Sequence, residues 1–514
     1  MMVVAQEAEM LQLSNLLDGL VKVEPSMDRE IGGLCLDSRT LAAGELFLAC
    51  AGHQQHGLVF AEQAAAKGAV AIIWEPDDAE GSQLAADLAK LSLPMIALPG
   101  LSHFVSLIAG RFYAHPSRGM NLFGITGTNG KTSICLLLAH ALQTDKPCGM
   151  IGTLGAGLPQ QLNATGMTTP DAVTLQRLLA DLKAQGAEAV TMEVSSHALD
   201  QGRVNALAFD CAIFTNLSRD HFDYHGTLEN YTAAKRRLFQ LSGVGCAVIN
   251  LDDPFGQELA RSLPDEVSVL GYAIDSKTLR PDRLKSWVWA KEVVSTPQGL
   301  RITVATPEEE VVLSSRLLGR FNASNLLAVL SVLLHLGWPL QKAIKTLAEL
   351  PTVPGRMELL GGRDKPAVVV DYAHTPDALE KALHSLRVHC SGRLIVVFGC
   401  GGDRDQGKRP IMGEVAARLA DICYLTDDNP RSELSALIID QILLGMPKSA
   451  PVWVVPDRGR AIQQAVANAD SGDMILVAGK GHEDYQLVRD QVKHFDDREV
   501  ATAALNAWGE STDE

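Results

Sequence analysis

Short apolar runs recur roughly every 22 to 30 residues in the last third of this chain. Segments long enough to form a helix separate the runs, which are AVVVDY, RLIVVFG, DICYLT, VWVVP and MILVAG. This spacing is typical of repeated βα units around a parallel sheet. Ligands of such sheets bind where the strands end. We therefore expect the segments that follow four of these strands to share one ligand-binding rim: DYAHTP, GCGGDRD, TDDNPR and AGKGHEDY.

Two earlier blocks of the chain also have the pattern of α/β structure. In the first block AEQAAAKG is helix-like and closed by a glycine, and the strand-like runs are ELFLA, AVAIIW and PMIAL. This block ends near Gly100. The second block opens with NLFGIT, a strand that runs into a glycine turn and then into the helix-like SICLLLAHAL. Further strand-like runs separated by helix-length segments predict a mostly parallel sheet: AVTMEV, CAIFTN and CAVIN.

Residues 267–315 differ, because their short β-runs follow one another without helices: SVLGYAI, SWVWAKEVV, LRITVA and EEVVLSS. They predict an antiparallel addition to the second block. The helical segment ASNLLAVLSVLLHLG then leads to ELPTVPGR, whose two prolines and glycine suit a linker and a boundary near Pro351. The sequence thus predicts an α/β protein of three domains: a small N-terminal domain over residues 1–100, a central parallel-sheet domain over 101–351 and a C-terminal Rossmann-like domain over 352–514.

Composition excludes several classes of partner. The net charge of −16 lacks the basic stripe that nucleic-acid binding requires, so we expect no nucleic-acid partner. The longest apolar run, LLAVLSVLLHLGW, is interrupted by His335 and is too short to cross a bilayer. The first residues are acidic where a secretory signal needs a basic start. Nine scattered cysteines without a CxxC pair suit thiols that a cytoplasm keeps reduced.

The segment GITGTNGKTS, residues 124–133, has the pattern of a phosphate loop between a strand and a helix. Gly127 and Gly130 let backbone N–H groups approach phosphate oxygens, Lys131 adds a cation, and the Thr132 hydroxyl can ligate Mg²⁺. The segment departs from the common GxxxxGK[ST] pattern, since Ile125 stands where the first glycine belongs. The strand before it and the helix after it favour a nucleotide site over an accidental turn.

Two further strand ends carry groups that suit a metal ion. VTMEVSSHAL places Glu193 near the end of one strand, and FTNLSRDHFDYHG follows another with Asp220, His221, Asp223 and His225. Carboxylate and imidazole groups on neighbouring strand ends can hold Mg²⁺ between a phosphate and an acceptor. For either histidine alone, the alternative is a structural side chain satisfied within the fold.

The segment DDNPRSE, residues 427–433, places several polar groups directly after the strand-like DICYL. Asp427, Asp428, Asn429 and Arg431 lie within five residues, and Pro430 stiffens the turn. A solvated loop is the simplest interpretation of such a cluster. Because the segment belongs to the expected rim, the sequence favours a ligand site instead.

Five motifs of the chain resemble those of the Mur ligases of peptidoglycan precursor synthesis: GTNGKT, EVSSHAL, NLSRDHFDYHG, YTAAKRRLF and DYAHTPD. The resemblance extends over nearly the whole chain in the expected order. Mur ligases use ATP to join an amino acid to a UDP-N-acetylmuramoyl peptide through an acyl phosphate. The chain is most similar to those that add the third amino acid, whose acceptor is UDP-N-acetylmuramoyl-L-alanyl-D-glutamate. The resemblance implies that the three domains bind the UDP substrate, ATP and the amino acid in turn, in a cytoplasmic monomer.

The resemblance also implies which residues handle ATP and Mg²⁺. Lys131, Glu193, His221 and Lys235 are the expected catalytic residues, with Lys235 carbamylated so that it can hold metal together with Thr132, Glu193 and His221. From the residues alone, Lys235 is one of three basic side chains on a helix and suits a solvated face. The implied ATP-binding residues are Gly127, Thr128, Asn129, Gly130, Lys131, Thr132, Ser133, Asn322, Arg356 and Asp371.

For the UDP-muramoyl dipeptide, the family pattern points to residues in all parts of the first two domains. Those that match positions for the uridine nucleotide are Leu36, Ser38, His53, Gln54 and Gln55. Those that match positions contacting the muramoyl peptide are Thr168, Thr169, Ser195, Gln201 and Arg203. Taken singly these are weak signals, because CLDSR can be an ordinary strand end and TTP a helix cap.

The family pattern implies that the DNPR part of DDNPRSE, residues 428–431, binds the incoming amino acid. DNPR marks Mur ligases that add meso-diaminopimelate, whereas lysine-adding relatives usually lack the arginine. A guanidinium such as that of Arg431 pairs bidentately with a carboxylate, so it can read the distal carboxylate that lysine does not have. The implied diaminopimelate-binding residues are Arg404, Asp428, Asn429, Pro430, Arg431, Gly479 and Glu483.

Two rival functions remain at this point. Folylpolyglutamate synthetases share the phosphate loop and the domain order, but an N-terminal block with DSRT and AGHQQHG is unlike theirs. A nucleotide-operated switch would use the same loop to change shape, yet it would have no need of the ligand-facing rim in the third block.

Overall fold

The structure is a computed structural model that describes residues 11–52, 55–76, 79–88, 90–218, 220–275, 284, 286–489 and 491–509. The described chain divides into two compact units. The first contains the residues up to Val248 together with Glu258–Val269, and the second contains Ile249–Gln257 and the residues from Leu270 onward. The division runs through three elements: β13 (Cys246–Asn250), α10 (Pro254–Ser262) and β14 (Ser268–Ala273). The predicted domain boundaries at residues 100 and 351 stay predictions.

A four-stranded parallel sheet forms the beginning of the first unit. Its order is β3 (Gly33–Cys35), β4 (Glu45–Ala49), β5 (Ala71–Trp74) and β6 (Met95–Ala97). Successive residues of β4 alternate between two cores: Leu46 and Leu48 pack with α4, whereas Phe47 and Ala49 pack with α2. This is the period of two that a strand buried on both faces requires. The other elements here are β1 (Leu11–Gln12), α1 (Leu13–Leu16), β2 (Glu30–Ile31), η1 (Gly57–Phe60), α2 (Ala61–Ala66), α3 (Ala79–Asp87) and α4 (Leu101–Phe112).

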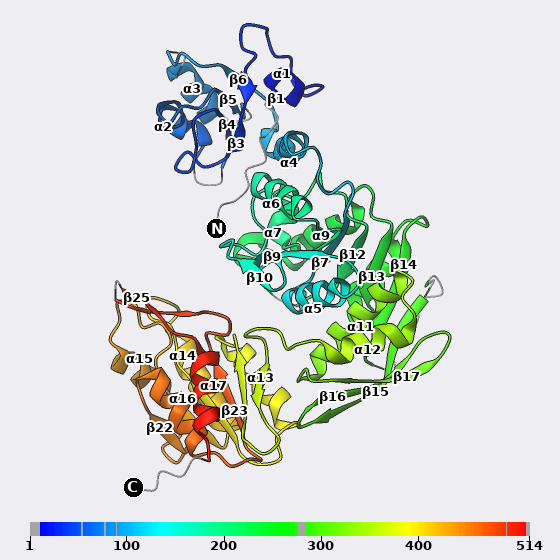
Figure 1. Cartoon of the computed structure of the whole chain (residues 1–514). Helices are drawn as coiled ribbons and strands as arrows, with labels where there is room; N and C mark the ends of the chain where they lie inside the picture. Colours follow the sequence, from blue (N-terminus) through cyan, green and yellow to red (C-terminus); the bar gives the residue numbers. More distant parts are fainter. Residues whose placement is uncertain are drawn as a thin grey trace. The chain divides into compact units, whose positions relative to one another are not determined.

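The rest of the first unit is built on the predicted parallel sheet. The strand order is β10 (Gln161–Asn163), β9 (Gly155–Leu158), β8 (Cys148–Gly152), β11 (Ala189–Glu193), β7 (Asn121–Thr126), β12 (Cys211–Phe214) and β13. The pairs β8/β11, β11/β7 and β7/β12 are parallel, whereas β9 and β10 continue the sheet antiparallel. The helix α5 (Lys131–Gln143) packs on β8, β11 and β7 (Figure 1). The other helices are α6 (Ala172–Ala184), α7 (Ser196–Asp200), α8 (Phe222–His225), α9 (Leu228–Arg236) and η2 (Arg237–Gln240).

The register of this sheet brings three strand ends together. Glu193 at the end of β11 lies opposite Ile125 of β7, and Phe214 at the end of β12 lies opposite Thr126. The segments that follow these strands therefore leave the sheet at one edge, as the sequence predicts.

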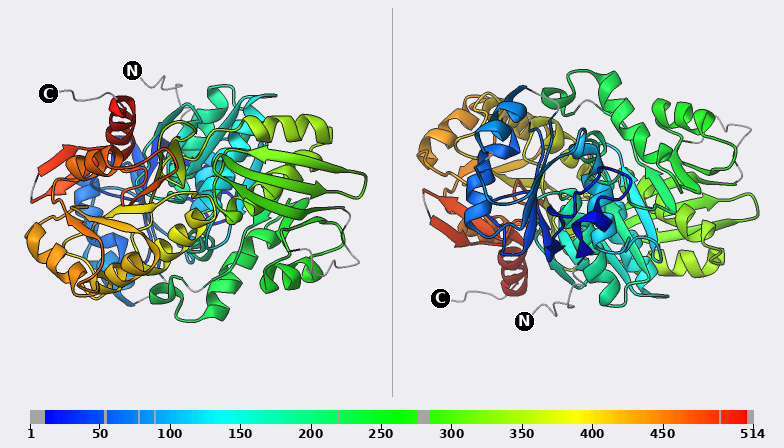
Figure 2. Two further views of the ribbon diagram at one scale, coloured as in Figure 1. Left: turned by 90° about the horizontal axis from the view of Figure 1, so that it is seen from below. Right: turned by 90° about the horizontal axis from the view of Figure 1, so that it is seen from above.

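The second unit begins with strands that correct one expectation. β15 (Ser286–Thr296), β16 (Gly299–Ala305) and β17 (Glu310–Ser315) are antiparallel as predicted, but β14 pairs with β15 in parallel. Consecutive β-runs in the sequence do not reveal the relative direction of neighbouring strands. The helices α11 (Arg320–His335) and α12 (Leu340–Glu349) cover one face of β15–β17 (Figure 2).

The remainder of the second unit has the predicted Rossmann-like arrangement. Its strand order is β18 (Glu358–Gly361), β19 (Ala367–Asp371), β23 (Met474–Ala478), β20 (Leu394–Phe398), β21 (Ile422–Leu425) and β22 (Val452–Val454). All neighbours are parallel except β18, an antiparallel edge strand. The five predicted strands are confirmed. The helices are α13 (Pro376–Arg387), α14 (Lys408–Leu419), α15 (Ser435–Leu443), α16 (Arg458–Ala467) and α17 (Asp497–Ala507).

Alternate residues of these strands build two separate cores. Val396 and Leu476 face the core shared with α13, α14 and α15, whereas Val397 and Ile475 face the core shared with α16 and α17. Helices thus cover both faces, which is why the strands read as unbroken apolar runs in the sequence. The sequence did not reveal β18 or the hairpin of β24 (Tyr485–Val488) and β25 (Gln491–His494), since neither is an apolar run.

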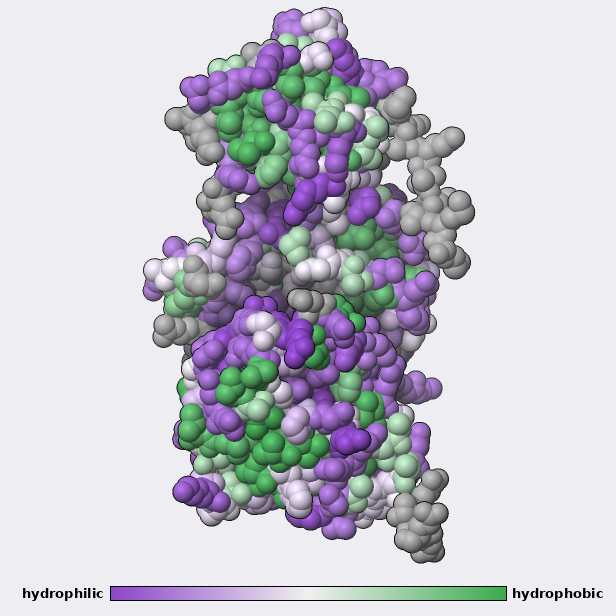
Figure 3. Space-filling view, turned by 90° about the vertical axis from the view of Figure 1, so that its left-hand side faces the viewer, coloured by the Kyte–Doolittle hydropathy of each residue, from purple (hydrophilic) through white to green (hydrophobic). Residues whose placement is uncertain are grey.

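The face drawn in Figure 3 is mostly hydrophilic, but apolar side chains gather on its lower part. Among the exposed apolar residues of the second unit are Leu437 and Leu444, in and just after α15, and Trp453 of β22. β22 ends its sheet, so its side chains have a neighbouring strand on one side only. No helix among the described residues is long and apolar enough to span a membrane.

We expect the substitution Leu476→Ala to destabilise the second unit by about 2–5 kcal/mol, the usual cost of a cavity in a close-packed core. Leu476 is fully buried in the central strand β23. Urea unfolding followed by circular dichroism should show a lower midpoint. The control Val492→Ala changes a side chain that is 71% exposed and should leave the midpoint within error. Equal midpoints for the two variants would contradict the assigned core.

Candidate active site

The phosphate-loop segment connects the end of β7 to the start of α5. Gly127 has a φ of +147°, and a Cβ at this position would lie 1.9 Å from the Thr215 hydroxyl oxygen, so only glycine fits. Asn216 holds the loop from the neighbouring strand end. Its backbone oxygen accepts from Thr128 N at 2.8 Å, and its side-chain oxygen accepts from Asn129 N at 3.0 Å. The loop geometry therefore depends on a residue that the motif itself does not contain.

Lys131 lies over the loop at the first turn of α5. Its Nζ donates to the backbone oxygens of Gly127 at 3.0 Å and Thr128 at 2.9 Å. A helix N-terminus with a lysine beside it favours an anion such as a phosphate group. The arrangement suits the outer phosphates of a nucleotide.

Glu193 lies buried at the end of β11 and contacts the helix start. Its Oε2 accepts from the Thr132 hydroxyl at 2.9 Å, and its Oε1 accepts from Thr153 N at 2.8 Å. Hydroxyl and carboxylate oxygens next to a phosphate site form a donor set that Mg²⁺ prefers. No group of three or more His, Cys, Asp or Glu side chains that could hold a metal ion exists within the described part of the chain. A magnesium site here would therefore combine the Thr132 hydroxyl and the Glu193 carboxylate with groups other than a ready-made cluster of such side chains.

Lys235 of α9 is 1% exposed, so the alternative of a solvated basic face is wrong. Its Nζ donates to the backbone oxygen of Gly127 at 2.8 Å and lies 4.3 Å from the centre of the Tyr231 ring. Burial, with a contribution from Lys131, holds the pKa of Lys235 well below its ordinary value. A neutral amine at the phosphate loop is a nucleophile, unlike a solvated ammonium group.

The two histidines after β12 have different surroundings. His221 is exposed, has a φ of +54°, and its ring nitrogen Nε2 lies 3.4 Å from Asp220. His225 is buried, and its Nε2 shares a 3.0 Å hydrogen bond with the Ser196 hydroxyl. Burial lowers the pKa of His225. The structural alternative therefore applies to His225, whereas His221 is accessible to a ligand.

The residues expected to contact the muramoyl peptide form one network with Glu193. The Thr169 hydroxyl donates to the Glu193 backbone oxygen at 2.9 Å and accepts from Ser195 N at 3.0 Å. Arg203 donates to the Thr169 backbone oxygen at 2.7 Å. The helix-cap alternative for TTP is wrong, because the cap of α6 is Asp171. Two further contacts complete the network, Thr168 with Thr153 at 3.0 Å and Gln201 with Arg203 at 2.6 Å.

The candidate uridine-binding residues lie around the four-stranded sheet. Leu36 follows β3 and is half-buried, the Ser38 hydroxyl donates to the Gln63 side chain at 2.7 Å, and Gln55 is exposed. His53, Gln54 and the side chain of Asp223 lie outside the described residues. The role of these residues in binding uridine stays a prediction.

The second unit confirms the rim predicted at the ends of β19, β20, β21 and β23. Gly479 N donates to the Asp371 backbone oxygen at 3.1 Å, and the Asn429 side chain donates to Glu483 at 3.1 Å. Arg431 Nη1 donates to the Gly402 backbone oxygen at 2.9 Å. All four segments therefore contact at least one of the others.

The DDNPRSE segment is not a solvated loop. Asp428 and Asn429 are 8% and 4% exposed, and Arg431 is half-buried with a φ of +50°. The β24–β25 hairpin holds the backbone of Arg431, since its N–H donates to Leu487 O at 3.0 Å and its oxygen accepts from Arg489 N at 2.7 Å. The guanidinium of Arg431 is thereby fixed at the rim, while Arg404 on the adjoining loop is exposed.

The three residues expected near adenine or ribose are in contrasting positions. Asn322 is buried in the first turn of α11, where its amide donates to Leu318 O at 2.8 Å. The Asp371 carboxylate accepts from Met357 N at 2.8 Å, and burial raises its pKa. The Arg356 guanidinium lies 5.0 Å from the centre of the Tyr372 ring. Their contact with a nucleotide stays a prediction.

Sequence reasoning missed several side chains that shape these sites. Thr153 binds the Glu193 carboxylate and stands outside the recognised motifs. Asn216 binds the phosphate loop and opens the motif NLSRDHFDYHG, but nothing in the sequence indicates this contact. Arg458 and Asp497 lie beneath the rim of the second unit. A basic residue two positions after the strand-like VWVVP is the sequence signal for Arg458, and it does not distinguish a buried from an exposed side chain.

Three family descriptions match the chain in order. The Mur ligase family catalytic domain matches residues 30–113, the Mur ligase middle domain matches residues 125–333, and the Mur ligase glutamate ligase domain matches residues 355–481. The matches cover most of the chain, and the protein belongs to the Mur ligase family of ATP-dependent ligases. The expected family, its α/β fold and its three-domain architecture are thus confirmed.

Similar proteins within this family share one name. The UDP-N-acetylmuramoyl-L-alanyl-D-glutamate–2,6-diaminopimelate ligase of Pseudomonas aeruginosa is 50% identical over 94% of this chain and 97% of its own. The ligase of that name from Coxiella burnetii is 46% identical, over 96% of this chain and 99% of its own. A solved structure of a ligase of this name has a TM-score of 0.72 at 34% identity, and covers 97% of this chain and 99% of that chain.

More distant structures share the fold alone. The MurF ligase of Thermotoga maritima in complex with ADP is 18% identical with a TM-score of 0.58, covering 87% of this chain and 93% of that chain. The folylpolyglutamate synthase of Mycobacterium tuberculosis is 17% identical with a TM-score of 0.55, and covers 78% of this chain and 94% of that chain. The rival function therefore has a far weaker resemblance than the diaminopimelate ligases.

We expect Gly127→Ala to weaken ATP binding at least tenfold, about 1.4 kcal/mol, because the new methyl group would overlap the Thr215 hydroxyl and displace the loop. Isothermal titration with ATP measures the effect. The matched control is Gly186→Ala, which has a φ of +86° but no atom within 4 Å of the added Cβ. It carries similar backbone strain without the overlap and should bind ATP normally. Normal binding by Gly127→Ala would rule out this loop as the phosphate site.

Proposed function

We propose that this protein adds meso-2,6-diaminopimelate to UDP-N-acetylmuramoyl-L-alanyl-D-glutamate, with conversion of ATP to ADP and phosphate, in cytoplasmic peptidoglycan precursor synthesis. The observation that carries the proposal is the 50% identity, over nearly the full chain, to a ligase named for this reaction. The rim of the second unit supports it, because Arg431 is fixed there with most of its guanidinium donors available to a ligand.

The reaction proceeds in two steps. The free carboxylate of the D-glutamyl residue attacks the γ-phosphate of ATP, which forms an acyl phosphate and releases ADP. The amine of diaminopimelate then attacks the acyl carbon, an amide bond forms, and phosphate leaves with loss of a proton from the amine. The chain must above all bring these groups together and orient them.

Charge is the main obstacle to the first step. Two unit anions that approach to 4 Å repel each other by about 4 kcal/mol at an effective dielectric constant of 20. Lys131 and the N–H groups at the start of α5 offset this repulsion where charge builds up on the phosphate. When Mg²⁺ is bound it supplies further positive charge, and Thr132, Glu193, His221 and carbamylated Lys235 would hold it.

Carbamylation of Lys235 has physical support in its surroundings. The neutral amine reacts with carbon dioxide to give a carbamate anion and a proton, and the buried Lys235 has a strongly lowered pKa. The product would place an anion near Lys131, and the positive charge of that lysine favours it.

The remaining residues would position the two substrates. For the acceptor we propose the network of Thr168, Thr169, Ser195, Gln201 and Arg203, which contacts the backbone of Glu193. A diaminopimelate molecule carries two carboxylates and two ammonium groups. Arg431 and Arg404 are cationic partners for its carboxylates, and Asp428 and Glu483 are anionic partners for its ammonium groups.

The proposed function is tested with UDP-N-acetylmuramoyl-L-alanyl-D-glutamate, ATP and an equal mixture of lysine and diaminopimelate. Mass spectrometry of the product should find diaminopimelate only. Arg431→Ala should raise the KM for diaminopimelate about 10- to 100-fold, as expected for loss of a charged hydrogen-bond pair, and leave the KM for ATP unchanged.

The control for this experiment is Arg489→Ala, which removes an exposed guanidinium two residues from the bonded Leu487 but keeps the backbone N–H that holds Arg431. It should retain the wild-type KM values. A lysine-containing product from the wild type, or equal effects of Arg431→Ala on both KM values, would contradict the proposal.

We expect ¹³C-bicarbonate to give a carbamate resonance in the wild type and none in Lys235→Arg. Removal of carbon dioxide should lower the activity of the wild type, and bicarbonate should restore it. As the pH falls through the lowered pKa of Lys235, the amine becomes protonated, so both the resonance and the activity should decline together. Full activity of the wild type without carbon dioxide would exclude a role for the carbamate.

A further inference from the structure

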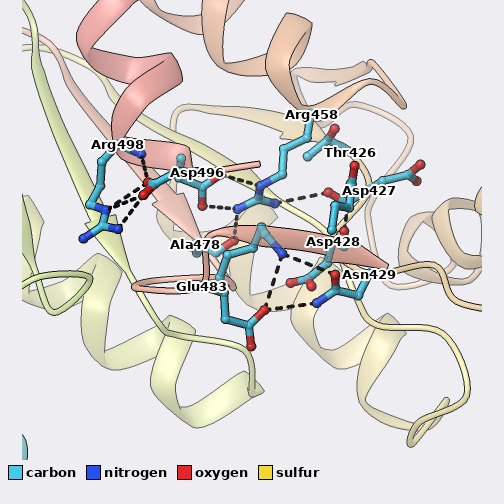
Figure 4. A network of polar contacts seen from close by, with 12 residues as sticks. Thr426, Asp427, Asp428, Asn429, Arg458, Ala478, Glu483, Asp496 and Arg498 are labelled. Carbon is cyan, nitrogen blue, oxygen red and sulfur yellow. Dashed lines mark hydrogen bonds and ion pairs between the residues drawn. The ribbon is translucent and has the colours of Figure 1, made fainter. Parts of the chain in front are cut away.

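Arg458 is a fully buried arginine at the start of α16, below the rim that we assign to the amino acid (Figure 4). Its guanidinium forms a fork with the buried Asp497, with Nε at 2.7 Å from Oδ1 and Nη2 at 2.8 Å from Oδ2. Two more hydrogen bonds reach backbone oxygens, that of Ala478 at 3.0 Å and that of Asp427 at 3.3 Å. This one side chain thus connects α16 to the start of α17 and to the chain at the ends of two strands.

The two backbone oxygens belong to the ends of strands that are not neighbours. Ala478 ends β23, Asp427 follows β21, and β20 lies between these strands in the sheet. The next residue after each oxygen belongs to the rim, namely Gly479 and Asp428. Arg458 therefore links the backbone next to Gly479 with the backbone next to Asp428, from a position below the rim.

Gly479 and Asp428 are in close contact with each other. Gly479 has a φ of +122°, and a Cβ there would lie 2.4 Å from Oδ2 of Asp428. The carboxylate thus occupies the space that a side chain at position 479 would need. A shift of the Ala478–Gly479 backbone would displace Asp428 directly.

The Asp428 carboxylate is buried, yet no hydrogen bond to it is found within the described part of the chain. Burial raises its pKa, while the nearby positive charges of Arg458 and Lys480 act in the opposite direction. Lys480 is itself buried and contacts Asn429 at 3.3 Å and Glu483 at 3.4 Å. Asp428 is therefore held by its position and by neighbouring charge, and its oxygens stay available to a ligand.

A fully buried guanidinium is costly unless an opposite charge and hydrogen bonds satisfy it. Asp497 supplies the opposite charge, so the Arg458 guanidinium is paired within the protein. The Arg458 guanidinium donates four hydrogen bonds, two to the Asp497 carboxylate and two to backbone oxygens. Such a closed pair fixes geometry, whereas a solvated pair would contribute little.

We propose that Arg458 and Asp497 are positioning residues for amino-acid recognition: they hold Asp428 and Gly479 in register for the incoming diamino acid without touching it. The inference rests on the proposed function for the identity of that amino acid. It adds two residues of α16 and α17 to the determinants of the site, both distant in sequence from the DNPR turn.

The same sheet has a second Arg–Asp pair at its opposite end, in which the aspartate is buried and the arginine side chain is 41% exposed. Arg393 donates to the buried Asp473 with Nε at 2.9 Å and Nη2 at 2.6 Å from Oδ2. These residues directly precede β20 and β23, so they join strands of the same sheet away from the rim. Substitutions of this pair control for loss of stability alone.

The experiment compares Arg458→Lys with Arg393→Lys, since each keeps the positive charge and loses the two-donor contact of a guanidinium with its aspartate. Both variants should have a lowered melting temperature. Arg458→Lys should raise the KM for diaminopimelate at least tenfold while the KM values for ATP and the UDP-substrate stay within twofold. Arg393→Lys should leave all three KM values unchanged. An unchanged KM for diaminopimelate in Arg458→Lys, or an equal rise in Arg393→Lys, would overturn the proposal.

Asp497→Glu provides the same test if Arg458→Lys does not accumulate as folded protein, because it keeps both charges and displaces the guanidinium. The result is separable from failure of the proposed function. If the wild type uses a different amino acid, the proposed function fails, and the KM for that amino acid in the two arginine variants still decides whether Arg458 positions the rim.

Discussion

Parallel strands that are buried on both faces bring chemically active turns to one edge of a sheet, and both candidate sites depend on this constraint. In the first unit the ends of β7, β11 and β12 gather the phosphate loop, Glu193 and the segment with His221. In the second unit the ends of β19, β20, β21 and β23 gather the rim. The apolar strands supply rigidity, and the polar turns supply the chemistry.

Charged groups at these edges are partly buried, so each must be satisfied by the fold. Around the phosphate loop, backbone oxygens of Gly127 and Thr128 accept from Lys131, and the former also accepts from Lys235. At the rim, Arg458 and Asp497 neutralise each other and leave the Asp428 carboxylate open. In both sites the buried supporting charges are thus satisfied by groups of the protein itself.

Much of the architecture was predictable because its signals are local. The runs AVVVDY and MILVAG became neighbouring strands β19 and β23, and GITGTNGKTS became a strand, a turn and a helix. The parallel pairing of β14 with β15 was not predictable, because strand direction depends on the path of the connecting segment. The β24–β25 hairpin was missed because the residues of β24 are half-buried, those of β25 are exposed, and neither strand is an apolar run.

The sequence by itself determined the family, the phosphate loop and the rim, since each is carried by residue types at short spacing. Only the tertiary structure decided which polar groups are buried. Lys235 looked like a solvated basic residue, and Arg458 had no motif, yet both are enclosed by elements from distant parts of the chain. Burial is the sum of many long-range contacts, so it sets the pKa of Lys235 and the partners of Arg458 in a way that no local pattern of residues can express.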